Sequence, residues 1–284
     1  MSQQYATYPS LRGQTVLITG GAEGIGAACV ELFWQQGSKV VFLDISETSA
    51  QKLLDKLSRI SSSSSSSSFS HAGNENNQSA GPAPLPQFKQ CDVTDLDRLR
   101  ACAEEVVAEN GGAVDVLLNN AASAGARTRV PTEEVTPQSW DDDVNVNLRH
   151  QFFLTQAVLP GMRAKGKGSI VNMGSITWRI PAAGLPVYTL CKAAIVGMTR
   201  THSKEFGKWG IRVNSVMPGS IATQRQIDEV LTPEYRAEVM AAQTIQRDLT
   251  PQEVARLILF LSADDSSAIT GSSYVVDGGW VSDP

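Results

Sequence analysis

Tyr188 and Lys192 lie four residues apart in a segment with a helical pattern. Residues i and i+4 share one face of a helix, so a phenol and an ammonium can approach each other there. A nearby cation favours the phenolate, and we expect Lys192 to lower the pKa of Tyr188 from its usual value of about 10. A tyrosine shifted in this way can exchange a proton with an alcohol near neutral pH. An isolated Tyr-x-x-x-Lys spacing is far more often an ordinary solvated helix face, so the pair needs support from the rest of the chain.

The segments that must position this pair alternate between strands and helices. Apolar runs rich in β-branched residues predict strands at 15–19, 39–43, 88–91, 114–118, 169–173, 211–216 and 273–276. Helical patterns follow at 27–36, 49–59, 139–165, 188–208 and 250–262. Continuous apolar strands that alternate with helices indicate a parallel sheet covered on both faces. We therefore predict an α/β fold, a doubly wound and mostly parallel Rossmann-type sheet with helices on both faces, in a single domain over residues 1–284.

Residues 61–86 interrupt this pattern. They begin with eight consecutive serines and continue through an Asn-, Gly- and Pro-rich stretch. Such a composition buries too little apolar surface to offset its ordering entropy, so we predict a disordered surface insertion. A tolerated expansion is the simpler interpretation, and a phosphorylated regulatory segment is the alternative. The core pattern resumes afterwards, so the insertion does not mark a domain boundary.

Charge and hydropathy narrow the class of partner. The chain has 284 residues and a formal net charge of −5, with no block of lysines or arginines. This balance argues against a nucleic-acid partner. The longest aliphatic run, 257–261, is far too short to cross a bilayer, and residues 1–5 are polar and unlike a signal peptide. We expect a cytoplasmic protein that acts on a small molecule.

The four cysteines do not indicate a metal or disulfide framework. They are Cys29, Cys91, Cys102 and Cys191, and none has C-x-x-C spacing or a histidine cluster nearby. We interpret them as core thiols in a reducing compartment, and we expect no metal site.

A glycine-rich turn separates the first predicted strand from its helix. It contains Gly20, Gly24 and Gly26 in a G-x-x-x-G-x-G spacing, with Glu23 and Ile25 between them. Glycines at such a turn let backbone N–H groups approach a pyrophosphate at the helix N-terminus. The position favours dinucleotide binding over a plain packing turn.

Asp44 follows the second predicted strand at the expected distance from the glycines. A carboxylate there accepts hydrogen bonds from the adenosine ribose hydroxyls and repels a 2′-phosphate. Glu23 adds to the repulsion, and no arginine adjoins Asp44 in the sequence, so we favour NAD over NADP. The alternative is that Asp44 merely begins the turn into the next helix.

Taken together these residues resemble the short-chain dehydrogenase/reductase family over nearly the whole chain outside the serine-rich insertion. The segment 91–93 resembles the family's adenine contact, 119–122 its Asn-Asn-Ala-Gly motif, 218–223 its nicotinamide loop and 276–279 its C-terminal signature. Ala122 replaces the motif's glycine and demands an ordinary backbone conformation. The resemblance implies cofactor contacts from Gly20, Glu23, Gly24, Ile25, Gly26, Asp44, Asp92, Val93, Asn119, Ala121, Tyr188, Lys192, Pro218, Gly219, Ile221 and Thr223.

Four residues match the family's catalytic tetrad: Asn147, Ser175, Tyr188 and Lys192. The resemblance implies that Tyr188 removes the hydroxyl proton while hydride leaves carbon for the nicotinamide. Ser175 would hold the reacting oxygen, Lys192 would lower the tyrosine pKa and bind the nicotinamide ribose, and Asn147 would hold a water that links Lys192 to solvent.

The segments 8–13, 145–150 and 174–178 are similar to sugar dehydrogenases of this family, which oxidise C1 of an aldose (a pentose, hexose or deoxyhexose) to the lactone. A sugar site needs hydrogen-bonding groups and often an aromatic plate. The candidate substrate contacts are Ser175, Trp178, His150 and Gln224, with Asn172, Arg127 and Arg179 as further polar candidates. A histidine on a helix, such as His150, is more often a packing or solvated residue than a ligand. Residues 221–244 are expected to form a mobile flap over the substrate.

Two other function classes remain open at this point. One is a family member that acts on a secondary alcohol, polyol or keto sugar. The other is a non-catalytic NAD-binding module, which the intact tetrad disfavours. The resemblance also implies a homotetramer (or homodimer) through the helices that carry Asn147 and Tyr188, and the small residues Ala193, Ala194 and Gly197 suit such packing.

Overall fold

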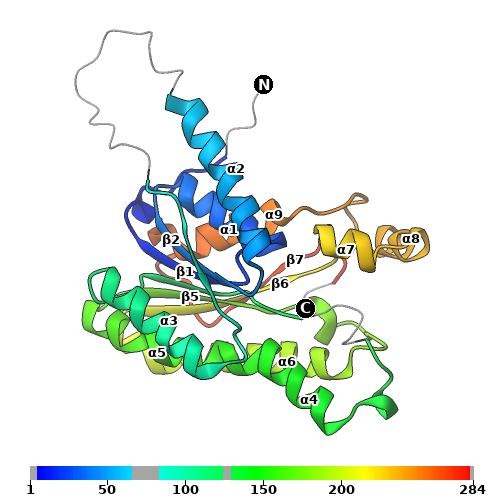
Figure 1. The fold of residues 1–284 in the computed structure, drawn as a ribbon. Coiled ribbons are helices and arrows are strands. Elements are labelled where there is room, and N and C mark those ends of the chain that lie inside the picture. The colour runs from blue at the N-terminus through cyan, green and yellow to red at the C-terminus, as the bar shows by residue number, and fades with distance from the viewer. Residues whose placement is uncertain (1–4, 66–82, 124–128, 282–284) are drawn as a thin grey trace.

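The computed structural model describes residues 5–65, 83–123 and 129–281. In these ranges one seven-stranded sheet has the order β3-β2-β1-β4-β5-β6-β7 (Figure 1). Its strands are β1 Thr15–Thr19, β2 Lys39–Asp44, β3 Gln87–Gln90, β4 Val116–Asn119, β5 Gly168–Met173, β6 Ile211–Pro218 and β7 Ser273–Val276. Every neighbouring pair runs parallel, so the predicted doubly wound α/β fold is confirmed.

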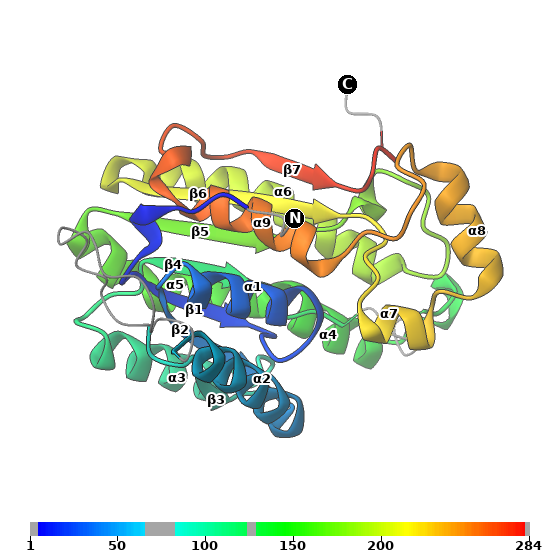
Figure 2. The same ribbon diagram turned by 90° about the horizontal axis from the view of Figure 1, so that it is seen from above.

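Helices cover both faces of the sheet (Figures 1 and 2). Within the described ranges the α-helices are α1 Gly24–Gln35, α2 Glu47–Ser65, α3 Leu96–Glu109, α4 Pro137–Val144, α5 His150–Lys165, α6 Pro186–Phe206, α7 Gln224–Glu229, α8 Pro233–Ala242 and α9 Pro251–Ser262. One face carries α1, α2 and α9, and the other carries α3, α5 and α6. The helices α7 and α8 lie beyond the carboxyl ends of the strands.

The strand β1 shows why the fold needs both layers. Successive side chains of a strand point to opposite faces, and all five residues of β1 are buried. Val16 and Ile18 belong to the apolar core under α1 and α9. Leu17 belongs to the separate core under α3 and α5. A strand that is apolar at every position is therefore stable only between two helical layers.

The predicted single helix over 139–165 is interrupted. It consists of α4, a π-helical segment Asn145–Arg149 and α5. A π-helical turn inserts one extra residue into the helix, and hydropathy does not reveal it. The helix α3 and the two helices α7 and α8 inside the predicted flap were also not expected.

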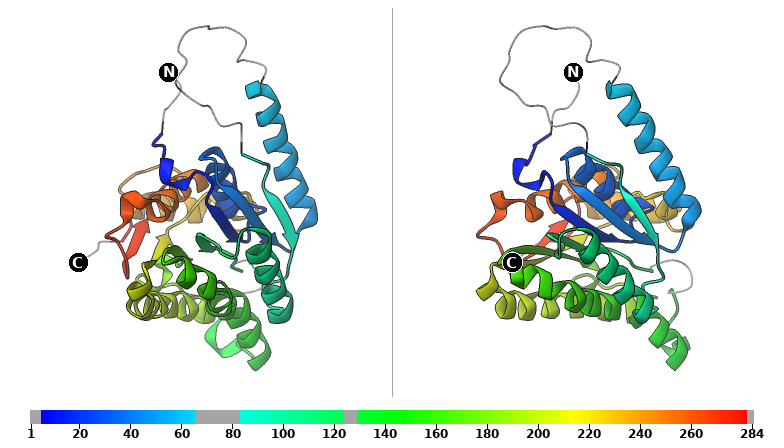
Figure 3. Two further views of the ribbon diagram at one scale, coloured as in Figure 1. Left: turned by 90° about the vertical axis from the view of Figure 1, so that its left-hand side faces the viewer. Right: turned by 60° about the vertical axis from the view of Figure 1, so that its left-hand side comes forward.

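The insertion was predicted to begin at residue 61, which is too early because α2 continues to residue 65. Ser61–Ser65 continue α2, which extends past the body of the sheet (Figure 3). The side chain of Ser62 donates a hydrogen bond to the carbonyl of Ser58, so a serine there returns a bond to its own helix. Residues 66–82 lie outside the described residues. At residue 83 the chain is close to α1, because the indole of Trp34 donates to the Ala83 carbonyl at 3.2 Å.

No α-helix in the described ranges is both long and apolar enough to cross a membrane. The four cysteines are buried and free. No cluster of three metal-ligating side chains was found among the residues that the structure describes.

Candidate active site

The carboxyl ends of β1, β2, β4, β5 and β6 bring the predicted site residues to one edge of the sheet. The order of strands reverses between β1 and β4, because chain progression runs from β1 towards β3 on one side and from β4 towards β7 on the other. In open α/β sheets a ligand binds in the crevice at such a switch point. The glycine turn follows β1 there, and Asn119 ends β4 beside it.

The glycine turn has the geometry of an anion cradle. Gly20 and Gly24 have positive φ values of 64° and 55°. A Cβ atom at Gly26 would lie 1.9 Å from the Gly20 carbonyl oxygen, so only glycine allows α1 to start this close to β1. The helix has no side-chain cap, since Glu23 at the N-cap instead accepts a hydrogen bond from the Ser49 hydroxyl. The first N–H groups of α1 are thus free for an anion, as a pyrophosphate requires.

Asp44 is held beside this turn. Its two carboxylate oxygens accept hydrogen bonds from the backbone N–H groups of Ala22 and Ser46, both at 3.0 Å. The residue therefore stabilises the turn, and its carboxylate lies next to the glycines, while its contact with a ribose stays a prediction. The backbone of Cys91 donates to the Asp44 carbonyl at 2.9 Å, which places the predicted adenine contact close by.

In that adenine segment Val93 is buried and Asp92 is exposed. The Asp92 carboxylate accepts two hydrogen bonds from Thr94, one from its backbone and one from its hydroxyl. These bonds fix the turn between β3 and α3.

The motif after β4 is tied to β1. The hydroxyl of Thr19 accepts from the backbone N–H groups of Asn120 and Ala121, both at 3.0 Å. The Asn120 side chain donates to the carbonyls of Thr19 and Gly20. In the described part of the chain only glycines have positive φ, so the ordinary backbone expected at Ala122 is confirmed. The role of Thr19 was not predicted, and a lone threonine at a strand end gives little signal for it.

Asn119 and Asn172 lie together behind the motif, in the interior. The Asn119 amide donates to Asn172 at 2.9 Å and to Thr155 at 3.2 Å, and Asn172 donates to Thr199 at 3.0 Å. Both asparagines are fully buried. Asn172 therefore connects β4, β5, α5 and α6, and it is not placed to contact a substrate.

The four tetrad residues come from three elements that meet at this edge. Ser175 follows β5, Tyr188 and Lys192 belong to α6, and Asn147 belongs to the π-helical segment. Ser175 is hydrogen-bonded to the Tyr188 side chain. The Lys192 ammonium lies 5.3 Å from the centroid of the Tyr188 ring and donates to the Met173 carbonyl at 2.9 Å.

The electrostatics of Tyr188 differ from the expectation. Burial raises its pKa, while the Ser175 hydrogen bond and the charges of Arg225 and Arg129 lower it in part. The prediction that Lys192 holds the pKa of Tyr188 below its usual value is therefore wrong, when only the groups of the protein itself are considered. The main physical reason is burial of the phenol, and the Lys192 ammonium does not offset it because it lies over the ring and binds the Met173 carbonyl. Burial also lowers the pKa of Lys192 to about 8.

Arg129 and Arg225 were missed by sequence reasoning. Arg129 lies in the loop after β4 and Arg225 lies on α7, and both are exposed. No sequence pattern distinguishes them from other surface arginines. Only the fold brings their charges near Tyr188.

The substrate candidates are scattered. Trp178 is half-buried, and its indole N–H contacts the Met217 sulfur at 3.0 Å. The guanidinium of Arg179 lies 4.9 Å from the centroid of its ring. Gln224 is exposed on α7 and donates to Asp228. His150 is completely buried, and Arg127 lies outside the described residues.

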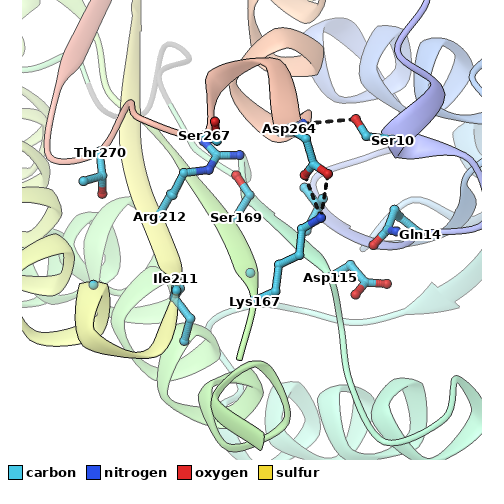
Figure 4. Close-up of a pocket in the computed structure, with 15 residues that line it drawn as sticks. Ser10, Gln14, Asp115, Lys167, Ser169, Ile211, Arg212, Asp264, Ser267 and Thr270 are labelled. Carbon is cyan, nitrogen blue, oxygen red and sulfur yellow. Dashed lines mark hydrogen bonds and ion pairs between the residues drawn. The ribbon is translucent and has the colours of Figure 1, made fainter. Parts of the chain in front are cut away.

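One pocket adjoins this region, and a second lies away from it. One of about 350 Å³ is lined by Ser123, Asn145, Val146 and Val187, so it adjoins the π-helical segment that carries Asn147. The other, of about 250 Å³, opens at the opposite edge of the sheet (Figure 4).

The second pocket does not take part in the site. Its Lys167 pairs with Asp264 (Figure 4). Its Arg212 donates hydrogen bonds to the carbonyls of Leu261 and Ala263. The charged groups there hold the start of β5 and β6 against the end of α9. They are not presented to a ligand.

Two family models match the chain. One, described as short chain dehydrogenase, matches residues 14–80. The other, described as enoyl-(acyl carrier protein) reductase, matches residues 66–281.

Curated relatives align over almost the full length. A D-xylose 1-dehydrogenase of Caulobacter vibrioides is 41% identical over 275 residues, covering 97% of this chain and 98% of the relative. A probable galactose dehydrogenase, GalD, of Rhizobium meliloti is 38% identical over 279 residues, covering 98% of this chain and 99% of the relative. Among solved structures, a putative gluconate dehydrogenase from Agrobacterium tumefaciens superposes with a TM-score of 0.82 at 26% identity, covering 97% and 98% of the two chains.

These matches confirm the resemblance seen in the sequence. They agree with the parallel sheet, the glycine turn at its switch point and the Ser175–Tyr188 contact. The chain belongs to the short-chain dehydrogenase family and is an oxidoreductase of the kind that uses a nicotinamide cofactor.

Proposed function

We propose that this enzyme oxidises C1 of an aldose to the lactone and passes the hydride to NAD. The observation that carries the proposal is the hydrogen-bonded Ser175–Tyr188 pair at the edge where the glycine turn lies. It occurs in a chain that is 41% identical, over 97% of its length, to a protein named D-xylose 1-dehydrogenase.

The cofactor side of the proposal rests on the fit of the residues present. The uncapped start of α1 and the glycines around it suit a pyrophosphate. The fixed carboxylate of Asp44 suits the two hydroxyls of an adenosine ribose and disfavours a 2′-phosphate, which supports NAD over NADP. A nicotinamide supplies the electron-pair acceptor for the hydride. Gly24 faces Thr223, since a Cβ atom there would lie 3.0 Å from the threonine methyl, so the proposed nicotinamide loop adjoins the glycine turn.

Each tetrad residue then has one task. Tyr188 removes the proton from the C1 hydroxyl, and Ser175 orients that oxygen through the bond it already shares with the phenol. Because burial raises the pKa of Tyr188, nearby positive charge is needed to favour the phenolate, and Arg225 and Arg129 contribute it. Lys192 is held by the Met173 carbonyl, and Asn147 is fixed through the bond from the Ser123 N–H at 3.0 Å.

The sugar would lie over this pair. Trp178, three residues after Ser175, offers the aromatic surface that sugar rings often stack on. The helices α7 and α8 form the proposed cover, because they span most of residues 221–244 beyond the strand ends. A cytoplasmic location and a homotetramer or homodimer are part of the same proposal.

A panel of aldoses, polyols and ketones tests the substrate claim. The purified enzyme is incubated with NAD and each compound, NADH is followed by absorbance, and the products are identified. We expect NADH only with one or more aldoses, together with a lactone that hydrolyses to the acid. Turnover of a polyol or ketone with no response to any aldose would support the alternative of a secondary-alcohol or keto-sugar dehydrogenase. No turnover at all, with NAD still bound, would support a non-catalytic module.

A further inference from the structure

His150 is a buried imidazole without a partner. It is the first residue of α5, directly after the π-helical segment, and none of its surface is exposed. Neither ring nitrogen has a hydrogen-bond partner of acceptable geometry among the described residues, although the Val146 carbonyl lies nearby. Buried polar groups are normally satisfied by protein or by ordered water, so an imidazole with two unmatched nitrogens needs an explanation.

A second unmatched group lies next to it in the chain. The amide nitrogen of Asn147 is also buried and unpartnered in the described structure, although the same side chain accepts from the Ser123 N–H. Both unmatched groups thus belong to the short stretch where the π-helical segment meets α5. A π-helical turn is frequent at functional sites, and here it carries one group and immediately precedes the other.

The ammonium of Lys192, on α6, lies within electrostatic reach of His150. Burial, with the Lys192 charge as the second cause, lowers the pKa of His150 to about 3, so the imidazole is neutral at physiological pH. A neutral imidazole has one N–H donor and one acceptor nitrogen. The ammonium has three donors, and its hydrogen bond to the Met173 carbonyl uses one.

We infer that His150 is a positioning residue for Lys192, which accepts a hydrogen bond from the ammonium through an ordered water shared with the Asn147 amide. This inference rests on the proposed function, in which Lys192 must stay charged and fixed beside Tyr188. The imidazole supplies an acceptor inside the protein, where the carbonyl of Met173 alone leaves two donors of the ammonium to be matched. An acceptor at His150 favours the charged form of a lysine that burial otherwise neutralises.

The first test needs neither substrate nor cofactor. Lysine labelled with ¹³C at Cε is titrated by NMR, and the Lys192 signal is assigned with Lys192→Met. In His150→Leu we expect the Lys192 midpoint to fall by up to about one pH unit, the scale of one hydrogen bond to a charged group. His150→Gln keeps an acceptor and should restore most of the midpoint. His202→Leu is the matched control, because His202 is also a buried histidine of α6 but stacks on Phe206. This variant should leave the Lys192 midpoint unchanged.

A folded His150→Leu protein with an unchanged Lys192 midpoint would overturn the inference. If that variant does not fold, the imidazole ¹⁵N signals of His150 are compared between the unmodified protein and Lys192→Met. A change confined to His150 supports the inference, and identical signals contradict it. With a substrate from the panel, His150→Leu should lower kcat and shift its pH profile with little change in the KM for the sugar, and His150→Gln should restore both. Failure of the aldose panel alone leaves the NMR result standing, so the two proposals are tested separately.

Discussion

At the scale of single residues, the site depends on how a few side chains are placed relative to one phenol. Tyr188 is hydrogen-bonded to Ser175, and burial raises its pKa. Arg225 and Arg129 lie within electrostatic reach of the phenol. Lys192 contacts the face of the ring. A phenol in this setting is a poor base unless positive charge is near it, so the reaction depends on charges that converge on the sheet edge.

Removing the phenol oxygen should remove the chemistry and little else. We expect Tyr188→Phe to reduce kcat by on the order of 10²–10⁴, the usual contribution of a positioned acid–base group. Dinucleotide affinity, measured by fluorescence titration, should change by no more than a few fold. Tyr235→Phe is the control, because this second tyrosine also lies near Arg129 and has no assigned proton transfer. Full activity in Tyr188→Phe would exclude the mechanism.

The buried ammonium of Lys192 should lower the stability of the folded protein at neutral pH. Its folded pKa of about 8 is below the ordinary 10.5, so the unfolded chain binds more protons between these values and stability rises with pH there. Below pH 8 the full cost of the buried ammonium is present. Lys192→Met should therefore raise the free energy of unfolding by about 1–3 kcal/mol at pH 7 while abolishing turnover. Urea unfolding at pH 7 and pH 10 checks this, and a gain that is equal at both values would contradict it.

Asp44 should decide between the two nicotinamide dinucleotides. Asp44→Asn removes the negative charge and keeps one acceptor oxygen, so one of the two backbone N–H bonds at the turn is retained and the other is lost. We expect kcat/KM with NADP to rise on the order of tenfold and that with NAD to fall, because the charge no longer repels a 2′-phosphate. Asp55→Asn on the exposed face of α2 is the control. An unchanged NAD/NADP ratio would assign Asp44 to the turn alone.

At the scale of elements, the close approach of α1 to β1 creates the cofactor cradle. A Cβ atom at Gly26 would meet the Gly20 carbonyl at 1.9 Å and the Asn120 amide at 2.7 Å. Backbone atoms on this turn cannot yield without moving the start of α1 itself.

Gly26→Ala should therefore weaken both the fold and dinucleotide binding. We expect a loss of about 1–3 kcal/mol in the free energy of unfolding, with cofactor affinity lowered at least tenfold. Gly207→Ala is the matched control, because a Cβ atom there meets nothing within 4 Å and the residue has a helical φ of −55°. It should be neutral or slightly stabilising. Thermal unfolding with and without NAD measures both effects, and equal behaviour of the two variants would contradict the cradle.

At the scale of the whole molecule, the outer helical layer leaves large apolar side chains in contact with solvent. Phe152 on α5 is 45% exposed and Leu190 on α6 is 46% exposed. Phe152 also contacts Phe153 and His202, so an aromatic group spans both helices. Exposed apolar surface of this kind is typical of a subunit interface.

Leu190→Arg should accordingly lower the assembly state. In the proposed interface a charge at position 190 would be buried without a partner, which opposes association strongly. We expect sedimentation velocity to show smaller species than for the unmodified protein. The control is Ile45→Arg, an exposed apolar position at the end of β2, which should leave the assembly unchanged. A monomer for the unmodified protein would exclude the proposed oligomer.

Much of this molecule follows from the order of its residues. Strand positions were predicted to within about two residues, because β-branched apolar runs such as 15–19 are stable only in a sheet covered by helices on both faces. Gly26, Asp44 and Tyr188 were predicted from type and interval, since the chemistry of a dinucleotide turn and a proton-transfer pair restricts both. Ser175 was predicted from its match to the family's tetrad. Local patterns of this kind are visible because each is encoded by neighbours in the chain.

Only the tertiary structure decided how those residues act on one another. The π-helical turn at Asn147, the burial of His150 and the raised pKa of Tyr188 all depend on helices that are remote in sequence and packed in space. Arg129 and Arg225 reach the phenol from two different segments, and Lys192 is turned towards a carbonyl. Residue types and intervals therefore determine which chemistry is available, whereas burial and long-range charge, which depend on distance in space, determine the protonation of each group.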